Sequence, residues 1–257
     1  MLRKVVFICG ALLLVASASA FAFPPIDLTA GQANVNGVDG SIWSSNITQP
    51  TGTGVYQPFL RLQNTPTEEG FNTDFTPFPL DDKSPANFTH SVKWSSLQTI
   101  TIGNTDYYSF QLDANEQQNG SRSLISLDRL KIYTGTNPAL GDLSTLGNPL
   151  YDLDGISNQT VFIETALKPG SGTDDLTCYI PKSFFANVNP NDYMYFYSQF
   201  GLSDGLDPGL VSGATFEEWR AVQGQSTSPP PVPEPVTMVL FGSGVLGMAG
   251  LRLRKKK

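Results

Sequence analysis

The sequence predicts an all-β fold, an antiparallel β-sandwich of jelly-roll type, and three observations support this. Charged residues make up only 15% of the chain, while Thr, Ser, Asn and Gly recur throughout. Short runs of alternating apolar and polar residues are separated by turn dipeptides such as Asn36-Gly37 and Asp39-Gly40. Almost no segment shows the apolar period of about 3.6 residues that marks an amphipathic helix. Roughly eight short strands joined by turns favour two packed sheets.

The expected strands follow from apolar–polar alternation over four to eight residues, or from aromatic and β-branched enrichment. They lie at residues 56–63, 91–94, 97–102, 107–112, 123–133, 160–167, 176–180 and 194–200. The last candidate, 216–222, is predicted as either a short helix or a final strand.

Connections between these strands are predicted from the turn residues. Gly103-Asn104 is a tight turn that makes the strands on either side of it a hairpin. In 123–133 the alternation slips between Leu127 and Asp128, which predicts a β-bulge. Residues 65–85 and 137–157 are rich in Pro, Gly, Asp and Asn, so we expect both to be long loops.

The N-terminus has the order of a secretory signal peptide. Arg3 and Lys4 precede an uncharged apolar run, residues 5–15, which small residues follow. A run of about 11 residues is too short to span a bilayer, which takes about 20. We expect signal peptidase to cut after Ala22, with Ala20 as the second choice, so that residues 1–22 are removed. The alternative is an uncleaved membrane anchor.

Three features follow one another at the C-terminus. A Val-Pro-Glu-Pro motif comes first, an apolar segment at residues 236–251 second, and a basic end third. The apolar segment has about 16 residues, the short limit for a single transmembrane helix, and the basic end should stay cytoplasmic. The motif and the basic residues are Val232, Pro233, Glu234 and Pro235, and Arg252, Arg254, Lys255, Lys256 and Lys257.

This ordered tail resembles the PEP-CTERM sorting signal, in which Pro-Glu-Pro precedes one short span and a basic end. The resemblance covers only the tail, residues 232–257. It implies recognition by a membrane-embedded exosortase, a transient stay in the inner membrane, and cleavage near the motif. It further implies release to the surface of a Gram-negative bacterium that makes exopolysaccharide. An ordinary single-span anchor that is never processed is the alternative.

The chain is therefore expected to have four parts: a signal peptide at 1–22, a β-sandwich ectodomain at 23–222, a Ser/Pro linker at 223–235, and a transmembrane helix with a basic tail at 236–257. Four stretches of the ectodomain also resemble a group of ectodomains attached to such tails, which implies one β-rich domain and no particular activity. They are residues 60–63, 68–74, 124–128 and 216–219.

The charge of the mature body excludes one class of partner. The chain has 16 basic and 23 acidic residues, and the terminal signals hold seven of the basic and one of the acidic residues. The remaining 9 basic and 22 acidic residues give a net charge of about −13. Nucleic-acid binding needs a basic surface, so we expect no nucleic-acid partner.

Residues for catalysis are sparse. His90 is the only histidine, and no Gly-x-Ser-x-Gly nucleophile elbow is present, so neither a Ser-His-Asp triad nor a usual zinc site is expected. Cys178 is left without a disulfide partner once Cys9 leaves with the signal peptide, and we expect it to be a buried thiol. We predict no enzymatic activity, and a glycoside-active enzyme with two facing carboxylates is the distant alternative.

Two binding features remain. Asp152 and Asp154, in Asp-Leu-Asp-Gly, resemble part of a calcium loop but lack the closing Glu, so structural calcium is the only cofactor considered. Aromatic residues at 107–108 and 193–197 place rings on both faces of their strands. One face should belong to the core, and the other is either a tyrosine rim or a platform on which sugars stack.

The sequence thus predicts an exported cell-surface or extracellular-matrix protein, sorted by an exosortase, with a structural or adhesive role linked to exopolysaccharide. A carbohydrate-binding module is the alternative function for the ectodomain.

Overall fold

The computed structural model describes seven stretches of the chain, all between residues 24 and 221. They are residues 24–45, 57–82, 88–116, 123–168, 172–202, 210–213 and 215–221. The predicted signal peptide, linker, sorting motif, transmembrane helix and basic tail lie outside the described residues. Within these stretches, no helix has the length and apolar character needed to cross a membrane.

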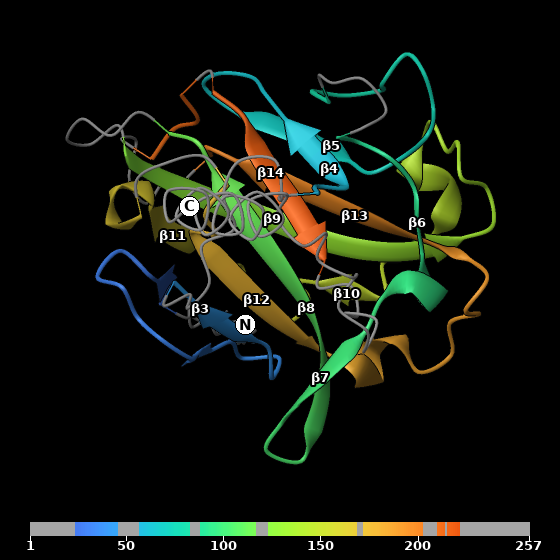
Figure 1. Ribbon diagram of the computed structural model, residues 1–257, viewed down its shortest axis with the longest axis horizontal. Coiled ribbons are helices and arrows are strands. Elements are labelled where there is room, and N and C mark those ends of the chain that lie inside the picture. The colour runs from blue at the N-terminus through green and yellow to red at the C-terminus, as the bar shows by residue number, and fades with distance from the viewer. Residues whose placement is uncertain are drawn as a thin grey trace, which may run out of the picture. The chain divides into compact units, whose positions relative to one another are not determined.

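One of the two sheets, which we name sheet A, has seven strands. Its strands lie in the order β1, β11, β9, β13, β5, while β10 also pairs with β9 and β6 with β13 (Figure 1). The bounds are β1 Ile26–Asp27, β5 Glu68–Phe71, β6 Val92–Lys93, β9 Leu124–Gly135, β10 Tyr151–Asp152, β11 Val161–Glu164 and β13 Tyr193–Phe200.

The second seven-stranded sheet, sheet B, has the order β2, β3, β12, β8, β14, β4, and β7 pairs with β8. The bounds are β2 Val35–Asn36, β3 Ile42–Ser44, β4 Leu60–Leu62, β7 Thr99–Ile102, β8 Thr105–Ala114, β12 Leu176–Pro181 and β14 Glu217–Ala221. In the described stretches, short 3₁₀ helices accompany the strands: η1 Trp94–Ser96, η3 Leu143–Leu146, η4 Thr165–Leu167 and η5 Lys182–Phe185.

Eight of the strands form a nested, fully antiparallel frame. In chain order they are β4, β5, β8, β9, β11, β12, β13 and β14. The first pairs with the last, the second with the seventh, the third with the sixth and the fourth with the fifth. The same eight strands lie four and four in the two sheets, as β4-β14-β8-β12 and β5-β13-β9-β11. The frame is thus one long hairpin folded over onto itself.

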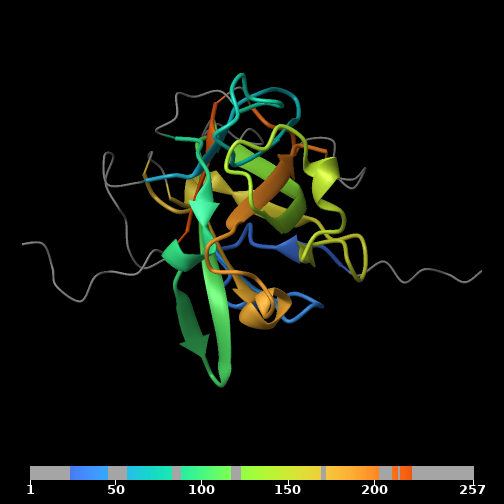
Figure 2. The same cartoon turned by 90° about the vertical axis from the view of Figure 1, so that its right-hand side faces the viewer.

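Aromatic rings from both sheets meet between them and close the core. The Phe196 ring of β13 lies 4.9 Å from that of Phe110 on β8 and 4.8 Å from that of Trp219 on β14. All three side chains are fully buried. Trp219 Nε1 also donates a hydrogen bond of 3.1 Å to Ser198 Oγ on the opposite sheet. This satisfies the one polar group that the indole brings into the core. Figure 2 shows the layers after a quarter turn.

Several sequence predictions are confirmed by these elements. The hairpin across Gly103-Asn104 is β7 and β8, and residues 217–221 form a strand rather than a helix. The predicted bulge is present, because Gln199 lies opposite Arg129 whereas Phe200 lies opposite Leu127, which leaves Asp128 as the extra residue.

Other predictions are wrong in detail. The expected loop at 65–85 contains β5, which was missed because Glu68-Glu69-Gly70 lacks the apolar alternation of a strand. The loop at 137–157 contains η3 and β10. Sheet A is mixed rather than purely antiparallel, since β1 pairs in parallel with β11. The three N-terminal strands have only two or three residues each, too few for a periodic signal.

A cluster of buried carboxyls consists of Glu68 on β5, Glu217 on β14 and Glu116, two residues after the end of β8. Glu217 is fully buried, faces the carboxyls of Glu68 and Glu116, and accepts no hydrogen bond from an N–H or hydroxyl of the described residues. Burial raises the pKa of Glu68 to about 7, and burial together with the neighbouring Glu68 raises the pKa of Glu217 well above its usual value. Carboxyls packed this closely share protons, because they cannot all ionise.

We predict that replacing Trp219 with Ala lowers the free energy of unfolding by about 3–5 kcal/mol, because it opens a cavity between the sheets. Urea denaturation of the full chain, followed by circular dichroism, measures the change. Ile156→Ala is the control: this side chain is 63% exposed, so the expected change is within about 0.5 kcal/mol. A loss below about 1 kcal/mol for Trp219→Ala would show that the aromatic packing does not hold the sheets together.

The carboxyl cluster predicts that the protein is more stable in mild acid than at neutral pH. A group whose pKa is raised in the folded state stabilises fully below its unfolded pKa, here 4.5 for Glu68, and the effect is lost as pH rises through about 7. Unfolding free energies measured across this interval should therefore fall. Glu217→Gln should reduce the fall, whereas Glu164→Gln, at a partly exposed site outside the cluster, should leave it unchanged. An unchanged slope in Glu217→Gln contradicts the assignment.

Candidate functional site

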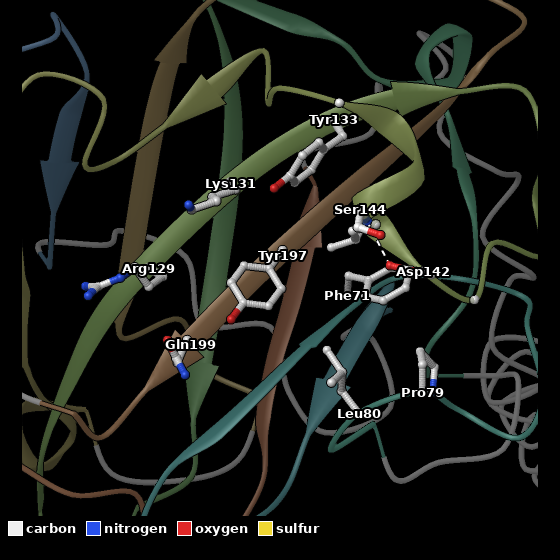
Figure 3. A pocket seen from close by; sticks show the side chains of 13 residues that line it. Phe71, Pro79, Leu80, Arg129, Lys131, Tyr133, Asp142, Ser144, Tyr197 and Gln199 are labelled. Atoms are coloured by element: carbon white, nitrogen blue, oxygen red, sulfur yellow. Dashed lines mark hydrogen bonds between the residues drawn. The ribbon is translucent and has the colours of Figure 1, made fainter.

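A groove of about 520 Å³ lies on the outer face of sheet A, on the side away from the core. Its floor consists of side chains from the two longest strands of the sheet, β9 and β13 (Figure 3). The volume is within the range of about 300–1,000 Å³ that is typical of small-molecule and cofactor sites. The floor residues are Arg129, Lys131, Tyr133, Tyr197 and Gln199.

Strand alternation places the β13 residues on this floor. Phe196 and Phe200 are fully buried in the core. Tyr197 and Gln199, which lie between them at alternate positions, must therefore point to the other face of the sheet. Both are partly exposed there. The core packing of β13 therefore determines the side chains that the groove receives from it.

The bulge at Asp128 determines which side chains of β9 point to the outer face. Leu127 and Leu130 are both fully buried although they are three residues apart, because the extra residue restores the register between them. Arg129, Lys131 and Tyr133 then follow at alternate positions on the outer face. Without the bulge, a one-residue slip would turn this set toward the core.

Two loops form the walls of the groove and are fixed to each other. Pro79 and Leu80 follow β5 on one side, and residues 141–147, which include η3, form the other. Thr73 Oγ1 donates a 2.7 Å hydrogen bond to the carbonyl of Leu140, and the Asp74 N–H donates a 3.0 Å bond to the carbonyl of Pro138. The groove is thus formed before any ligand enters.

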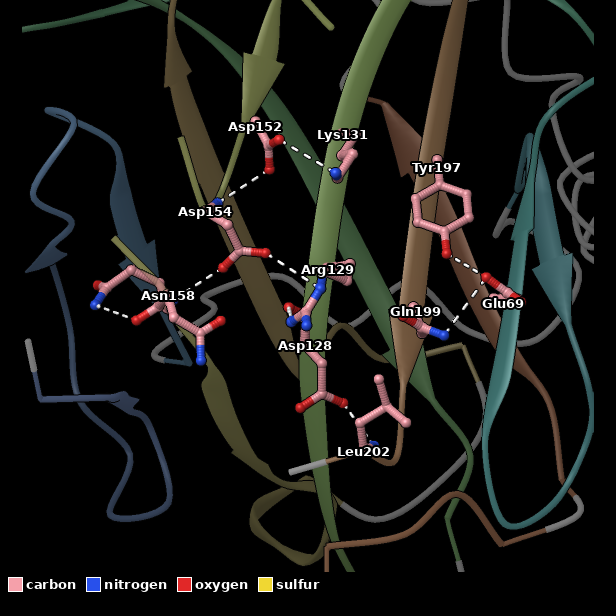
Figure 4. Close-up of polar contacts among 11 residues, drawn as sticks. Glu69, Asp128, Arg129, Lys131, Asp152, Asp154, Asn158, Tyr197, Gln199 and Leu202 are labelled. Atoms are coloured by element: carbon pink, nitrogen blue, oxygen red, sulfur yellow. Dashed lines mark hydrogen bonds and ion pairs between the residues drawn. The ribbon is translucent and has the colours of Figure 1, made fainter. Parts of the chain in front are cut away.

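The two cations of the floor are each paired with a carboxylate (Figure 4). Lys131 Nζ lies 3.2 Å from Asp152 Oδ2, since the two residues lie opposite each other where β10 pairs with β9. Arg129 Nε lies 3.3 Å from Asp154 Oδ2, two residues farther on. The other oxygen of each carboxylate accepts a hydrogen bond from the backbone. The Asp154 N–H donates to Asp152 Oδ1, and the Gln159 N–H donates to Asp154 Oδ1.

A third carboxylate positions the β13 side chains. Glu69 Oε2 accepts a hydrogen bond from the Tyr197 hydroxyl and one of 3.4 Å from Gln199 Nε2. Burial raises the pKa of the Tyr197 phenol, and the bond to Glu69 raises it further. Burial also raises the pKa of Tyr133. Both rings therefore stay neutral, and the hydroxyl of Tyr197 is held in position by its bond to Glu69.

The residues singled out from the sequence are distributed differently from the expectation. Asp152 and Asp154 lie close together, but each is ion-paired with a floor cation; calcium binding there stays a prediction. In the described part of the chain, no group of three or more His, Cys, Asp or Glu side chains is arranged to hold a metal ion. His90 and the buried Cys178 are not among the residues that line the groove.

Sequence reasoning pointed to one part of the floor and missed the rest. The aromatic run at 193–197 was identified as a core face with a further face of rings, and Tyr197 belongs to that second face. Arg129, Lys131 and Tyr133 were recognised only as the polar side of an alternating strand. The alternation predicted that these three side chains share one face of their strand. It did not predict the pairing of β9 with β13, which brings them next to Tyr197 and Gln199.

Comparison with known proteins identifies the C-terminal tail. A family model described as the PEP-CTERM protein-sorting motif matches residues 231–255. The match includes the predicted motif Val232, Pro233, Glu234 and Pro235, and three of the predicted basic residues, Arg252, Arg254 and Lys255. Neither the curated proteins nor the solved structures that were compared contain a match to the chain.

The matched motif marks an exported protein and names exosortase as its processing partner. The described part of the chain is β-rich, as expected for the ectodomain. The chain is therefore a PEP-CTERM protein: an exported, exosortase-sorted chain whose sorting signal follows a domain of two β-sheets.

Proposed function

We propose that the β-rich domain binds polysaccharide in the groove of sheet A, and that the protein is a structural or adhesive component linked to exopolysaccharide. The observation that carries this proposal is the floor of the groove, where the rings of Tyr133 and Tyr197 lie beside fixed polar groups. A pyranose ring has apolar C–H faces that pack on aromatic rings and a rim of hydroxyls that need hydrogen bonds. The groove offers both kinds of contact in one preformed site.

The strand order supports a jelly-roll architecture for the domain. Two four-stranded antiparallel layers with nested pairing, first strand with last and so inward, are what an eight-stranded double-sheet jelly roll contains. Additional short strands extend both layers. In such a frame an outer sheet face is supported across its whole width by the core behind it, which suits an extended ligand.

The routing of the protein completes the proposal. Signal peptidase cuts after Ala22 or Ala20 during export, and the segment 236–251 holds the chain briefly in the inner membrane. Exosortase then cleaves near Pro233-Glu234-Pro235, and the domain reaches the surface or the extracellular matrix of a Gram-negative bacterium. The matched sorting motif and the residues of the N-terminus support these steps.

Binding without catalysis is the favoured activity. A glycosidase places two carboxyl groups on either side of the scissile bond, about 5–10 Å apart. Among the residues that line the groove, Asp142 is the one acidic side chain, and its Oδ1 accepts a hydrogen bond from the Ser144 N–H at the start of η3. The alternative function, a carbohydrate-binding module, shares this site and differs only in what the bound polysaccharide is used for.

Tyr133→Ala should weaken binding to a retained polysaccharide about tenfold, because an aromatic surface for the sugar ring is lost. The measurement is affinity electrophoresis of the full chain in detergent, in gels that contain mixed-linkage glucan, xylan, mannan or alginate. Tyr193→Ala is the matched control, since Tyr193 is also a partly exposed residue of sheet A but does not line the groove. Equal retention of both variants would place the binding elsewhere, and no retention of the unaltered chain on any gel would refute the proposal.

Cleavage by exosortase predicts the mass of the mature protein. The chain isolated from its native host should begin after Ala22 or Ala20 and end near Pro235, as measured by intact mass and by the C-terminal peptide. Replacing Glu234 with Ala should leave the basic tail attached. A mature molecule that still carries Lys257 would instead show that the tail is an unprocessed anchor.

A further inference from the structure

The charges around the groove distinguish between two kinds of polysaccharide. Resting on the proposed function, we propose that the groove is specific for neutral glycan chains and excludes chains that carry uronate or sulfate groups. The Lys131–Asp152 and Arg129–Asp154 ion pairs set this specificity, because they keep both cations of the floor occupied by the protein's own carboxylates.

The Lys131–Asp152 pair is built into the ladder of sheet A. The two residues lie directly opposite each other on β9 and β10, so their side chains meet without any loop movement. Their side chains are 31% and 24% exposed, so the pair is partly shielded from solvent. Asp152 Oδ2, at 3.2 Å, already neutralises the charge of Lys131, so a ligand carboxylate that approaches Lys131 also meets the negative charge of Asp152.

Arg129 is engaged more fully. Its Nε lies 3.3 Å from Asp154 Oδ2, and its Nη1 donates a 2.7 Å hydrogen bond to the backbone carbonyl of Asp128. Strong arginine–carboxylate recognition uses two parallel N–H groups of the guanidinium. Asp154 neutralises the guanidinium and two of its nitrogens already have partners in the protein, so an incoming uronate would have to share this charge with Asp154.

The remaining charges of the site repel an acidic ligand. Asp142 lies on the rim of the groove, and Glu69 lies beside the floor on the neighbouring strand β5, where it holds Tyr197 and Gln199. Together with Asp152 and Asp154 this makes four carboxylates around two cations, on a body whose net charge is about −13. Like charges brought together without compensation oppose binding and slow the encounter.

A neutral sugar needs none of these bonds to be broken. A hydroxyl group donates one hydrogen bond and accepts others, so it fits beside a carboxylate and a cation that are already paired. The groove supplies such pairs along β9, hydroxyl and amide groups along β13, and two neutral rings between them. Contacts of this kind do not depend on a net charge of the ligand, so binding should change little with ionic strength.

The test compares neutral and acidic polymers on the full chain in detergent. Binding is measured by isothermal titration with mixed-linkage glucan, xylan, polygalacturonate and alginate, at low and at moderate salt. We expect a saturable, salt-insensitive signal with at least one neutral polymer and none with the acidic ones. Tighter binding of an acidic polymer overturns the inference but leaves the proposed function intact, whereas no binding of any polymer in this test or in the gels described above refutes both.

A paired variant tests the cause. Asp152→Asn with Asp154→Asn removes both counter-charges, while the retained side-chain oxygens can still accept the hydrogen bonds from the Asp154 and Gln159 N–H groups. Affinity for polygalacturonate should rise by about tenfold, and this gain should shrink in added salt.

The control is Asp106→Asn, which removes the carboxylate from an ion pair with Lys182 outside the groove and should produce no such gain. If the paired variant binds the acidic polymer no better than this control, the two ion pairs do not set the specificity and the inference is wrong. Circular dichroism shows whether each variant is folded. If the double variant is not folded, the single variants Asp152→Asn and Asp154→Asn are compared with the control instead.

Discussion

The contact of Phe196 with Trp219 is the interaction on which the rest of the structure depends. It joins β13 of one sheet to β14 of the other, and the indole N–H reaches across to Ser198. Because side chains alternate along a strand, this contact decides which residues of β13 point outward. The core and the groove are therefore two consequences of one packing arrangement, and a change in strand register would lose both.

Acidic side chains form two different arrangements in the molecule, one at the groove and one among the buried carboxyls. In the groove, carboxylates hold lysine, arginine, tyrosine and glutamine in position. Between β5 and β14, the buried carboxyls of Glu68, Glu116 and Glu217 lie close together, so that they share protons. The first arrangement presents polar groups to a ligand, and the second makes stability depend on pH.

Much of the strand pattern could be predicted from the sequence, because long strands such as β8, β9 and β13 alternate clearly. The bulge at Asp128 was also visible as a slip in that alternation. Two things could not be predicted. Glu68 in β5 is polar yet buried, so the strand lacks the apolar–polar alternation from which a strand is predicted. Asp152 and Asp154 resemble metal ligands locally, and only the distant pairing of β10 with β9 provides their actual partners, Lys131 and Arg129.

The nested pairing also has a mechanical consequence. In the chain, β14 is the last described strand before the sorting motif, and it is paired on both of its edges, with β4 and with β8. Any tension that reaches the domain from its C-terminal side is therefore applied to a strand held by two ladders rather than to one that can be peeled from a sheet edge. Because β4 is the first strand of the frame and β14 the last, that load passes directly from the last strand of the frame to the first.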